Sequence, residues 1–158
     1  MKFRTSILEN IIYGELLYVL EDYAFNFLPP SKSGITSVVI DTLQIVIDEY
    51  GRVVEVFGYC PYFDWKCDDI APPNYLQGCL FVELDNIIPG VSERLAEYGE
   101  WRVSFNSTTG WVCVGETNYS PAAIAVEFVS SILAVVEGDS LKAIWLHPES
   151  LPKDLLCK

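Results

Sequence analysis

The sequence VVIDTLQIVIDEYGRVVEVFGYC, residues 38–60, decides the predicted fold. In its first half, Leu43, Ile45 and Ile47 share one parity, which is typical of a strand with one buried face. The polar tetrapeptide DEYG then ends in Gly51, a residue type that adopts positive φ in turns without steric cost. We therefore predict that two antiparallel segments, joined by this turn, form a central hairpin on which the remaining elements pack.

The length and composition are those of one globular domain. The chain has 158 residues, of which 51% are hydrophobic, 13% aromatic and 20% charged. A chain of this length buries roughly 70% of the surface that its unfolded form exposes, which is enough for a self-sufficient core. No linker, repeat or low-complexity tract divides the sequence, so we predict a single domain over residues 1–158.

The charge balance narrows the range of partners. The chain carries 22 acidic and 10 basic residues, which gives a formal net charge of −12 and a pI near 4.3. Phosphate backbones and anionic lipids repel such a chain unless it has a local basic patch, and its basic residues are scattered singly. We therefore expect no nucleic-acid partner and no membrane partner. An acidic surface fits a basic partner protein, although solubility alone also accounts for it.

The N-terminal segment lacks the unbroken apolar run of a signal peptide, because Glu9 and Glu15 interrupt it. The longest apolar stretch, residues 122–136, is shorter than a bilayer span and contains Glu127. These features predict a cytoplasmic protein. Cysteines stay reduced in that compartment, so we expect free thiols at all five positions, Cys60, Cys67, Cys79, Cys113 and Cys157.

Three segments carry helix signals. Ser6 and Glu9 match a capping box, apolar residues then recur at helical spacing, and Pro29 ends this N-terminal segment. A short helix is predicted over residues 89–98, with a proline in its first turn and a glycine at its end. The clearest helix is predicted over residues 121–137. That segment is almost entirely apolar, so the helix must be buried on most sides, against the sheet and against another element or subunit.

Alternating apolar residues predict further strands. They occur in residues 78–84 and 141–146, and a second hairpin is expected from residues 101–105 and 111–115. The connection between this hairpin and the last strand is long enough for a parallel crossover. We therefore predict an α+β fold. It comprises a mostly antiparallel or mixed sheet of five to six strands, packed against an N-terminal helix and a buried C-terminal helix.

The segment PYFDWKCDDIAPPNY, residues 61–75, is the predicted binding surface. Its three prolines argue against a regular element, and ordered loops of this length are often functional. Aromatic rings and carboxylates together suit the Lys and Arg side chains of a partner, through charge pairing and cation–π contact. We assign binding to six side chains, Tyr62, Asp64, Trp65, Asp68, Asp69 and Tyr75.

Signals for catalysis and metal binding are weak. His147 is the only histidine, and no acid is marked as its orienting partner. Cys60 and Cys67 lack the close spacing and the second thiol pair of a zinc site. No glycine-rich phosphate loop or nucleotide fingerprint is present. We therefore expect no catalytic residue, no metal site and no cofactor, and we expect Glu127 to be held by an arginine in an ion pair.

Two classes of function remain. The first is a non-catalytic, acidic protein-binding module of the inhibitor or immunity type, which covers a basic surface of a partner protein with the 61–75 loop. The second is a small-ligand-binding protein or minor enzyme with a pocket between the sheet and the buried helix, where Glu127, Cys113 or His147 acts. A homo-oligomer is compatible with either class, if the apolar helix has a second face that one domain leaves uncovered.

Overall fold

The computed structural model describes residues 1–151, and β-strands dominate it. Strands account for 48% of the residues and helical turns for 4%, and no helix of seven or more residues occurs in the described part. The predicted α+β class is therefore wrong. The two helical segments are single 3-10 turns, η1 (Leu20–Asp22) and η2 (Tyr62–Asp64). Neither is long and apolar enough to cross a membrane, and the described residues contain no other helix.

The strands form two large sheets and one short pair. In order across the six-stranded sheet, they are β10 (Glu93–Ala96), β4 (Thr36–Ile40), β5 (Leu43–Ile47), β6 (Val53–Tyr59), β3 (Ala24–Leu28) and β2 (Glu15–Val19). The seven-stranded sheet consists of β7 (Lys66–Cys67), β11 (Val103–Phe105), β12 (Val112–Gly115), β15 (Ser140–Leu146), β14 (Ile132–Glu137), β13 (Ile124–Val129) and β8 (Leu76–Gln77). The antiparallel pair is β1 (Lys2–Ser6) with β9 (Cys79–Glu83). Within the large sheets, only the edge strands β10, β7 and β8 are parallel to their neighbours.

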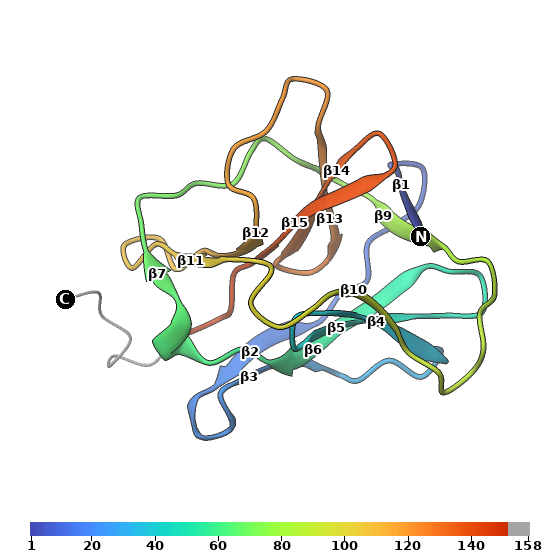
Figure 1. Ribbon diagram of the computed structural model, residues 1–158, viewed down its shortest axis with the longest axis horizontal. Helices are drawn as coiled ribbons and strands as arrows, with labels where there is room; N and C mark the ends of the chain where they lie inside the picture. Colours follow the sequence, from blue (N-terminus) through green and yellow to red (C-terminus); the bar gives the residue numbers. More distant parts are fainter. Residues whose placement is uncertain (152–158) are drawn as a thin grey trace.

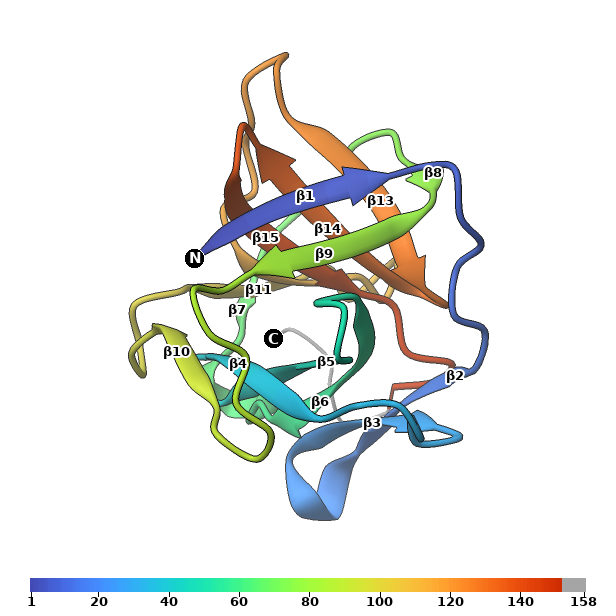
Figure 2. The ribbon, with the colours of Figure 1, turned by 90° about the vertical axis from the view of Figure 1, so that its right-hand side faces the viewer.

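The two large sheets face each other and share the main hydrophobic core (Figure 1). Ile45 and Val56 enter this core from the six-stranded sheet, and Ile132 and Ile144 enter it from the seven-stranded sheet; all four are fully buried. The β1–β9 pair lies across the side between the two sheets, where β9 contacts both β13 and β6 (Figure 2). Each strand of a sandwich can thus bury one apolar face in a common interior.

The predicted central hairpin is confirmed as β5 and β6, which pair antiparallel. Leu43, Ile45 and Ile47 are buried in the main core, and Gly51 has the positive φ of 82° that the turn requires. Residues 38–47 are nevertheless two strands. Asp41, with a φ of 58°, begins a two-residue turn that separates β4 from β5. Aspartate adopts this left-handed conformation more readily than most residues. The turn was not predicted, because the residues on both sides of it are apolar.

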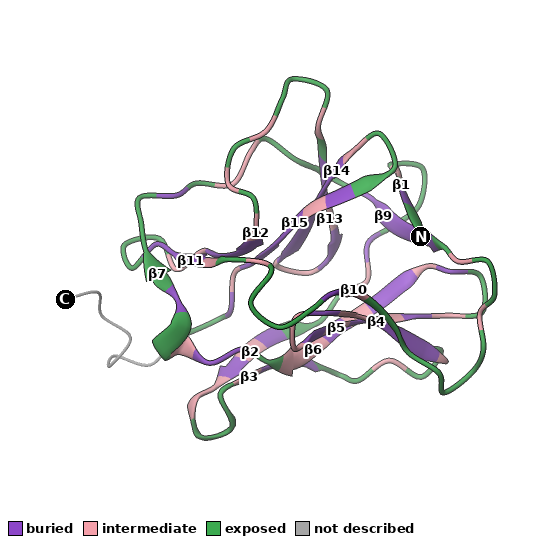
Figure 3. Cartoon of the chain, viewed as in Figure 1, coloured by how far each residue is buried: buried purple, intermediate pink, exposed green. Residues whose placement is uncertain are grey.

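The helix predicted for residues 121–137 is wrong, because this segment contains the hairpin β13–β14. Its apolar residues do not alternate with polar ones, since the sheet is buried on both faces. In β14, Ile132 and Ala134 face the main core, whereas Leu133 and Val135 belong to a second core on the outer face. An apolar run of this kind cannot be told from a buried helix by its period alone. Figure 3 shows the strands of this sheet as mostly buried.

Loops of the same chain cover the outer face of the seven-stranded sheet. The second core combines residues of this sheet with residues of the covering loops: Ile70, Cys113, Ala125, Leu133, Val135, Ala143 and Trp145, with Trp111, Tyr119 and Ala123 packed against them. Trp145 Nε1 donates a hydrogen bond to the Tyr119 hydroxyl at 2.8 Å, which satisfies the buried indole. The homo-oligomer prediction rested on an uncovered face of an apolar helix, and that helix does not exist.

The predicted N-terminal helix is also wrong, because its residues, which begin at the last residue of β1, form β2, the single turn η1 and β3. Leu16 and Tyr18 in β2, and Phe25 and Phe27 in β3, are buried at alternate positions and enter the main core. Their pairing along the sheet outweighs the helical spacing seen in the sequence, as tertiary context often does. The short helix predicted for residues 89–98 is replaced by β10, which pairs with β4.

Other predicted strands are confirmed. β9 and β15 match residues 78–84 and 141–146, and β11 and β12 form the predicted second hairpin. The predicted parallel crossover is wrong, because β12 and β15 are antiparallel, with Val112 opposite Leu146. The chain between them forms a hairpin instead of a helix, so it returns to the sheet in the opposite direction.

The cysteines differ in state. Cys60, Cys79 and Cys113 are buried free thiols, whereas Cys67 is disulfide-bonded, so the expectation that every thiol is reduced is wrong. Cys157 lies outside the described residues. Burial raises the pKa of Cys60 and of Cys113 to about 12, which keeps both thiols protonated and unreactive at neutral pH.

Candidate functional site

The predicted binding loop crosses the outer face of the seven-stranded sheet. We call residues 68–75 the strap, because it leaves β7 at one edge of that sheet and reaches β8 at the other edge. Ile70 lies in the strap and is buried in the second core. Asn106 is buried and donates from Nδ2 to the Ile70 carbonyl oxygen at 2.9 Å. The strap therefore covers apolar surface along part of its length.

The structure consequently separates the six predicted binding residues. Tyr62 and Asp64 precede β7, Asp68 and Asp69 follow it, and Tyr75 lies beside β8 at the opposite edge of the sheet. The three carboxylates are exposed, as is 43% of Tyr75. These residues do not form one surface, although Tyr62 and Asp64 remain together.

Trp65, the sixth predicted residue, is a core residue. Only 8% of it is exposed, and its ring stacks on Phe25 with centroids 5.9 Å apart and an interplanar angle of 12°. It also lies 5.0 Å from the ring of Tyr18 and 5.4 Å from that of Phe105. Trp65 cannot contact a partner directly, but it anchors the short segment that carries Tyr62 and Asp64.

Four aromatic side chains gather on the surface beside this anchor. We call Tyr23, Tyr59, Tyr62 and Phe63 the aromatic surface. The ring centroid of Tyr23 lies 6.4 Å from that of Tyr59, 6.0 Å from that of Tyr62 and 5.5 Å from that of Phe63. Phe63 is 62% exposed, Tyr59 43% and Tyr23 37%. They come from η2, from the end of β6 and from the turn after η1, at one end of the six-stranded sheet (Figure 1).

Backbone pairing holds these segments together. The Cys60 N–H donates to the Tyr23 carbonyl oxygen at 2.7 Å, in continuation of the pairing between β3 and β6. The Tyr18 hydroxyl donates to the Cys60 carbonyl oxygen at 2.8 Å and accepts the Tyr62 N–H at 3.1 Å. Burial raises the pKa of Tyr18, so its hydroxyl stays protonated as this arrangement requires. The aromatic surface is thus tied to the buried sheet, which lowers the entropic cost of presenting it.

Carboxylates border the aromatic surface. Glu21 and Asp22 are exposed in η1, immediately before Tyr23, and Asp64 is exposed immediately after Phe63. The hydroxyl of Tyr98, a residue that is 65% exposed, donates to Asp64 Oδ2 at 3.1 Å. This hydrogen bond to the carboxylate raises the pKa of Tyr98. Exposed rings next to carboxylates can contact the apolar stem and the charged head of a Lys or Arg side chain.

A groove of about 470 Å³ adjoins the aromatic surface. Tyr59, Asp64 and Tyr98 line it near the aromatic surface, and Asp41 lines it as well. A second groove of about 600 Å³ shares Trp101 and Arg102 with the first. The second groove is lined by charged residues of both signs: Asp68, Glu100, Arg102, Glu116 and Lys142.

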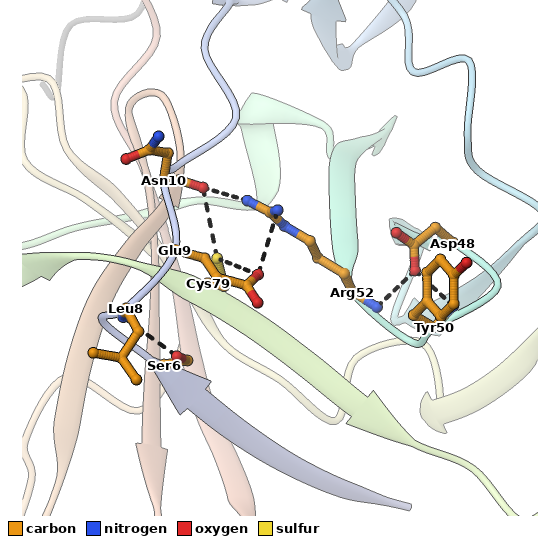
Figure 4. A network of polar contacts seen from close by, with 8 residues as sticks. All are labelled: Ser6, Leu8, Glu9, Asn10, Asp48, Tyr50, Arg52 and Cys79. Carbon is orange, nitrogen blue, oxygen red and sulfur yellow. Dashed lines mark hydrogen bonds and ion pairs between the residues drawn. The ribbon is translucent and has the colours of Figure 1, made fainter.

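A separate polar network links the β1–β9 pair to the turn of the central hairpin (Figure 4). Arg52 donates to the carbonyl oxygen of Asn10, and its Nη1 lies 3.6 Å from Glu9 Oε2. The Cys79 thiol lies 3.7 Å from the same carboxylate oxygen. Burial raises the pKa of Cys79, the opposite of what an activated nucleophile needs. The network joins segments that are distant in the sequence.

The three residues assigned to a ligand pocket do not share a site. His147 stacks on Trp111 with ring centroids 4.6 Å apart, and its Nε2 lies 2.9 Å from the Thr109 carbonyl oxygen. Cys113 is buried in the second core, and its thiol lies 3.5 Å from the Glu116 carbonyl oxygen. None of the three lines either groove.

Glu127 has a structural role in the hairpin β13–β14. Its Oε2 accepts the Ser131 N–H at 3.0 Å, and its Oε1 accepts a hydrogen bond from Gln77 Nε2 at 3.1 Å. No ion pair with Arg94 or Arg102 occurs in residues 1–151, because the carboxylate lies at a hairpin turn and not on a buried helix. In the same range, no group of three or more His, Cys, Asp and Glu side chains is arranged to hold a metal ion.

Three members of the aromatic surface, Tyr23, Tyr59 and Phe63, are not among the six predicted binding residues. Tyr59 belongs to the run FGYCPYF, residues 57–63, whose density of aromatic residues extends the signal used for the loop. Tyr23 lies in the segment for which the sequence predicts a helix, and only the pairing of β3 with β6 brings it beside Tyr59. No family model matches the chain, and no curated protein matches it.

Proposed function

We propose that the protein is a non-catalytic, acidic protein-binding module that covers a basic surface of a partner with the aromatic surface and its carboxylate border. The observation that carries the proposal is the gathering of four aromatic side chains on an exposed surface next to Glu21, Asp22 and Asp64. Exposed aromatic clusters rimmed by polar groups are typical of interaction sites. Tyrosine gives a large contact area at low entropic cost, and interfaces are enriched in it.

The net charge of −12 supports the same partner class. Opposite charge speeds the encounter of two proteins and suppresses wrong partners, and exposed carboxylates at the rim contribute mainly in this way. The aromatic rings then contribute contact area that salt does not screen. Binding should therefore weaken as ionic strength rises, because its electrostatic part is screened, and should depend on the rings at every salt concentration.

The alternative function, a small-ligand protein or minor enzyme, was tied to a pocket between the sheet and a buried helix. The described residues contain no such helix. We therefore retain the binding module as the proposal. Cytoplasmic localisation stays a prediction, as does the absence of nucleic-acid and membrane partners.

The test is capture of partners from a native extract by the wild-type protein and by two single variants. Phe63→Ala removes the most exposed ring of the aromatic surface, and Tyr50→Ala removes a ring that is 78% exposed at the turn of the central hairpin. A partner of basic sequence should be retained by wild type and by Tyr50→Ala, and released by high salt. Its affinity for Phe63→Ala should fall about tenfold, as for the loss of a central aromatic contact. Equal capture by both variants would contradict the proposal.

A charge-reversal pair separates the binding surface from the overall charge. Asp64→Lys changes the border of the aromatic surface, and Asp139→Lys makes the same change at the exposed two-residue turn between β14 and β15. Both variants have the same net charge. If binding depends only on overall attraction, they lose affinity equally; if it depends on this surface, Asp64→Lys loses more.

A further inference from the structure

We propose that the 470 Å³ groove beside the aromatic surface receives a lysine or arginine side chain from an extended basic segment of the partner, with Asp41 as the residue that pairs with its cationic head. This inference rests on the proposed function, because it specifies which part of the partner binds beside the aromatic surface. Three observations support the inference: the shape of the groove, the hydrogen bonding of Asp41 and the charges around Asp41.

The groove is continuous with the aromatic surface. Tyr59 belongs to both, and Asp64 lines the groove directly after η2. Buried apolar residues also line it, including Leu43 and Val114. Its volume of about 470 Å³ lies within the range of small-molecule sites, about 300–1,000 Å³, and so leaves room for one long side chain with adjoining backbone. An apolar lining with carboxylates suits a side chain with an alkyl stem and a positive head.

Asp41 has an incomplete set of partners. Its Oδ2 accepts the Gly99 N–H at 2.9 Å, whereas its Oδ1 is buried and has no hydrogen-bond partner among the described residues. A buried carboxylate oxygen without a partner is unfavourable, because it has lost its hydrogen bonds to water without replacing them. Asp41 is held in place by the two-residue turn between β4 and β5, and its own N–H donates to the Ala96 carbonyl oxygen at 3.0 Å. The backbone thus fixes a carboxylate that lines the groove and has one oxygen without a hydrogen-bond partner.

Two cations line the same groove and narrow the class of ligand. Lys66 and Arg102 are exposed, and within residues 1–151 neither forms an ion pair with Asp41 or Asp64. Together they offset the charge of the two carboxylates, so a free metal ion gains little from the groove as a whole. A peptide fits better, because its cationic head can pair with Asp41 while its carbonyl oxygens accept hydrogen bonds from Lys66 and Arg102.

The test is an NMR titration of the 15N-labelled full chain with a capped tripeptide, acetyl-Ala-Arg-Ala-amide. The reporter is the backbone amide of Gly99, because its N–H is hydrogen-bonded to Asp41. We expect the Gly99 resonance to shift with saturation. The same tripeptide with citrulline in place of arginine has nearly the same shape without the charge, and should bind about tenfold more weakly.

Asp41→Asn is the matched variant. Asparagine tolerates the φ of 58° and can still accept the Gly99 N–H, so the turn should be preserved. We expect this variant to bind the arginine tripeptide about tenfold more weakly, while Asp139→Asn, at a distant exposed turn, binds it as wild type does. Should Asp41→Asn fail to fold, Asp64→Asn carries the test, with an expected weakening of about threefold from a more exposed carboxylate.

Equal affinity for the arginine and citrulline tripeptides would overturn the inference, and so would wild-type affinity in the folded carboxylate variant. The two proposals fail separately. If Phe63→Ala loses the partner but the tripeptide leaves Gly99 unmoved, the groove inference is wrong and the binding module stands. If the tripeptide binds but Phe63→Ala and Tyr50→Ala capture the partner equally, the groove binds a cation and the proposed binding surface is wrong.

Discussion

Two hairpins of similar length, β5–β6 and β13–β14, have opposite burial patterns. In β5, the residues Leu43, Ile45 and Ile47 are fully buried, whereas Gln44 and Val46 between them are only half-buried. In β14, all five residues from 132 to 136 are buried. The first hairpin therefore shows the alternation of buried and less buried residues that indicates a strand in a sequence. The second hairpin does not show this alternation. A strand shows period 2 only where one of its faces meets water.

The strap and a neighbouring loop cause this difference. Ile70 of the strap and Tyr119 of the loop after β12 cover the outer face of the seven-stranded sheet, whereas the outer face of β5 carries the half-buried Gln44 and Val46. Both covering segments are irregular and rich in polar residues, so their own sequences do not indicate that they cover a sheet. The outer face of β13–β14 is therefore buried by residues that are distant in the sequence.

The largest effect should come from truncating the outer-face residue of each hairpin. Leu133→Ala removes a fully buried side chain from the second core and should lower the free energy of unfolding by about 2–5 kcal/mol. Val46 lies on the corresponding outer face of β5, where its side chain is half-buried. Val46→Ala should lower the free energy of unfolding by about 1 kcal/mol or less. Equilibrium denaturation of both variants measures the difference. Equal losses of stability would show that the two outer faces are buried alike, and the proposed difference between the hairpins would be wrong.

A smaller effect should follow from weakening the strap itself. Ile70→Ala removes its buried anchor and should cost about 2 kcal/mol, near the low end for such truncations, because a loop can relax around the lost volume. Ile124→Ala is the control, since Ile124 is 56% exposed, and its effect should stay near 0.5 kcal/mol or below. Chemical denaturation followed by tryptophan fluorescence reports both values. Unchanged stability in Ile70→Ala would mean that the strap does not seal the second core.

The smallest effect should be seen in the dependence of stability on alkaline pH. Burial raises the pKa of Cys113, in the second core, from 9.0 to about 12, as it does for Cys60 in the main core. A thiol whose folded pKa is raised stabilises the fold fully below its unfolded pKa, and this contribution is lost as pH rises through the folded pKa. The window therefore runs from about pH 9 to about pH 12. At pH 10 the loss per thiol is about 1 kcal/mol.

Two alanine variants test this pH dependence. Cys113→Ala and Cys60→Ala should each flatten the fall of unfolding free energy between neutral pH and about pH 10, by about the same amount. The measurement is denaturation at a series of pH values. If only Cys60→Ala flattens the curve, the second core admits water and its thiol titrates normally, so the two faces of the sheet are not equally buried.

The candidate site was predictable in part, because part of it comes from one short segment of the sequence. Tyr62 and Asp64 lie in a short segment that is rich in aromatic residues and acids, and the structure keeps them together on the surface. Trp65 in the same segment is buried against Phe25, because a large ring beside the sheet gains more from the core than from water. Tyr75 lies apart from Tyr62 and Asp64, because the strap carries it to the other edge of the sheet.

The sequence by itself determined the acidic charge and the hairpin β5–β6. Both depend on local information: charge is a sum over residues, and the alternation of Leu43, Ile45 and Ile47 before the turn at Gly51 is a pattern between near neighbours. Only the tertiary structure decided that β13–β14 is a hairpin and that Tyr23 joins the aromatic surface. The physical reason is that burial on two faces, and contact between distant strands, depend on which segments meet when the chain folds.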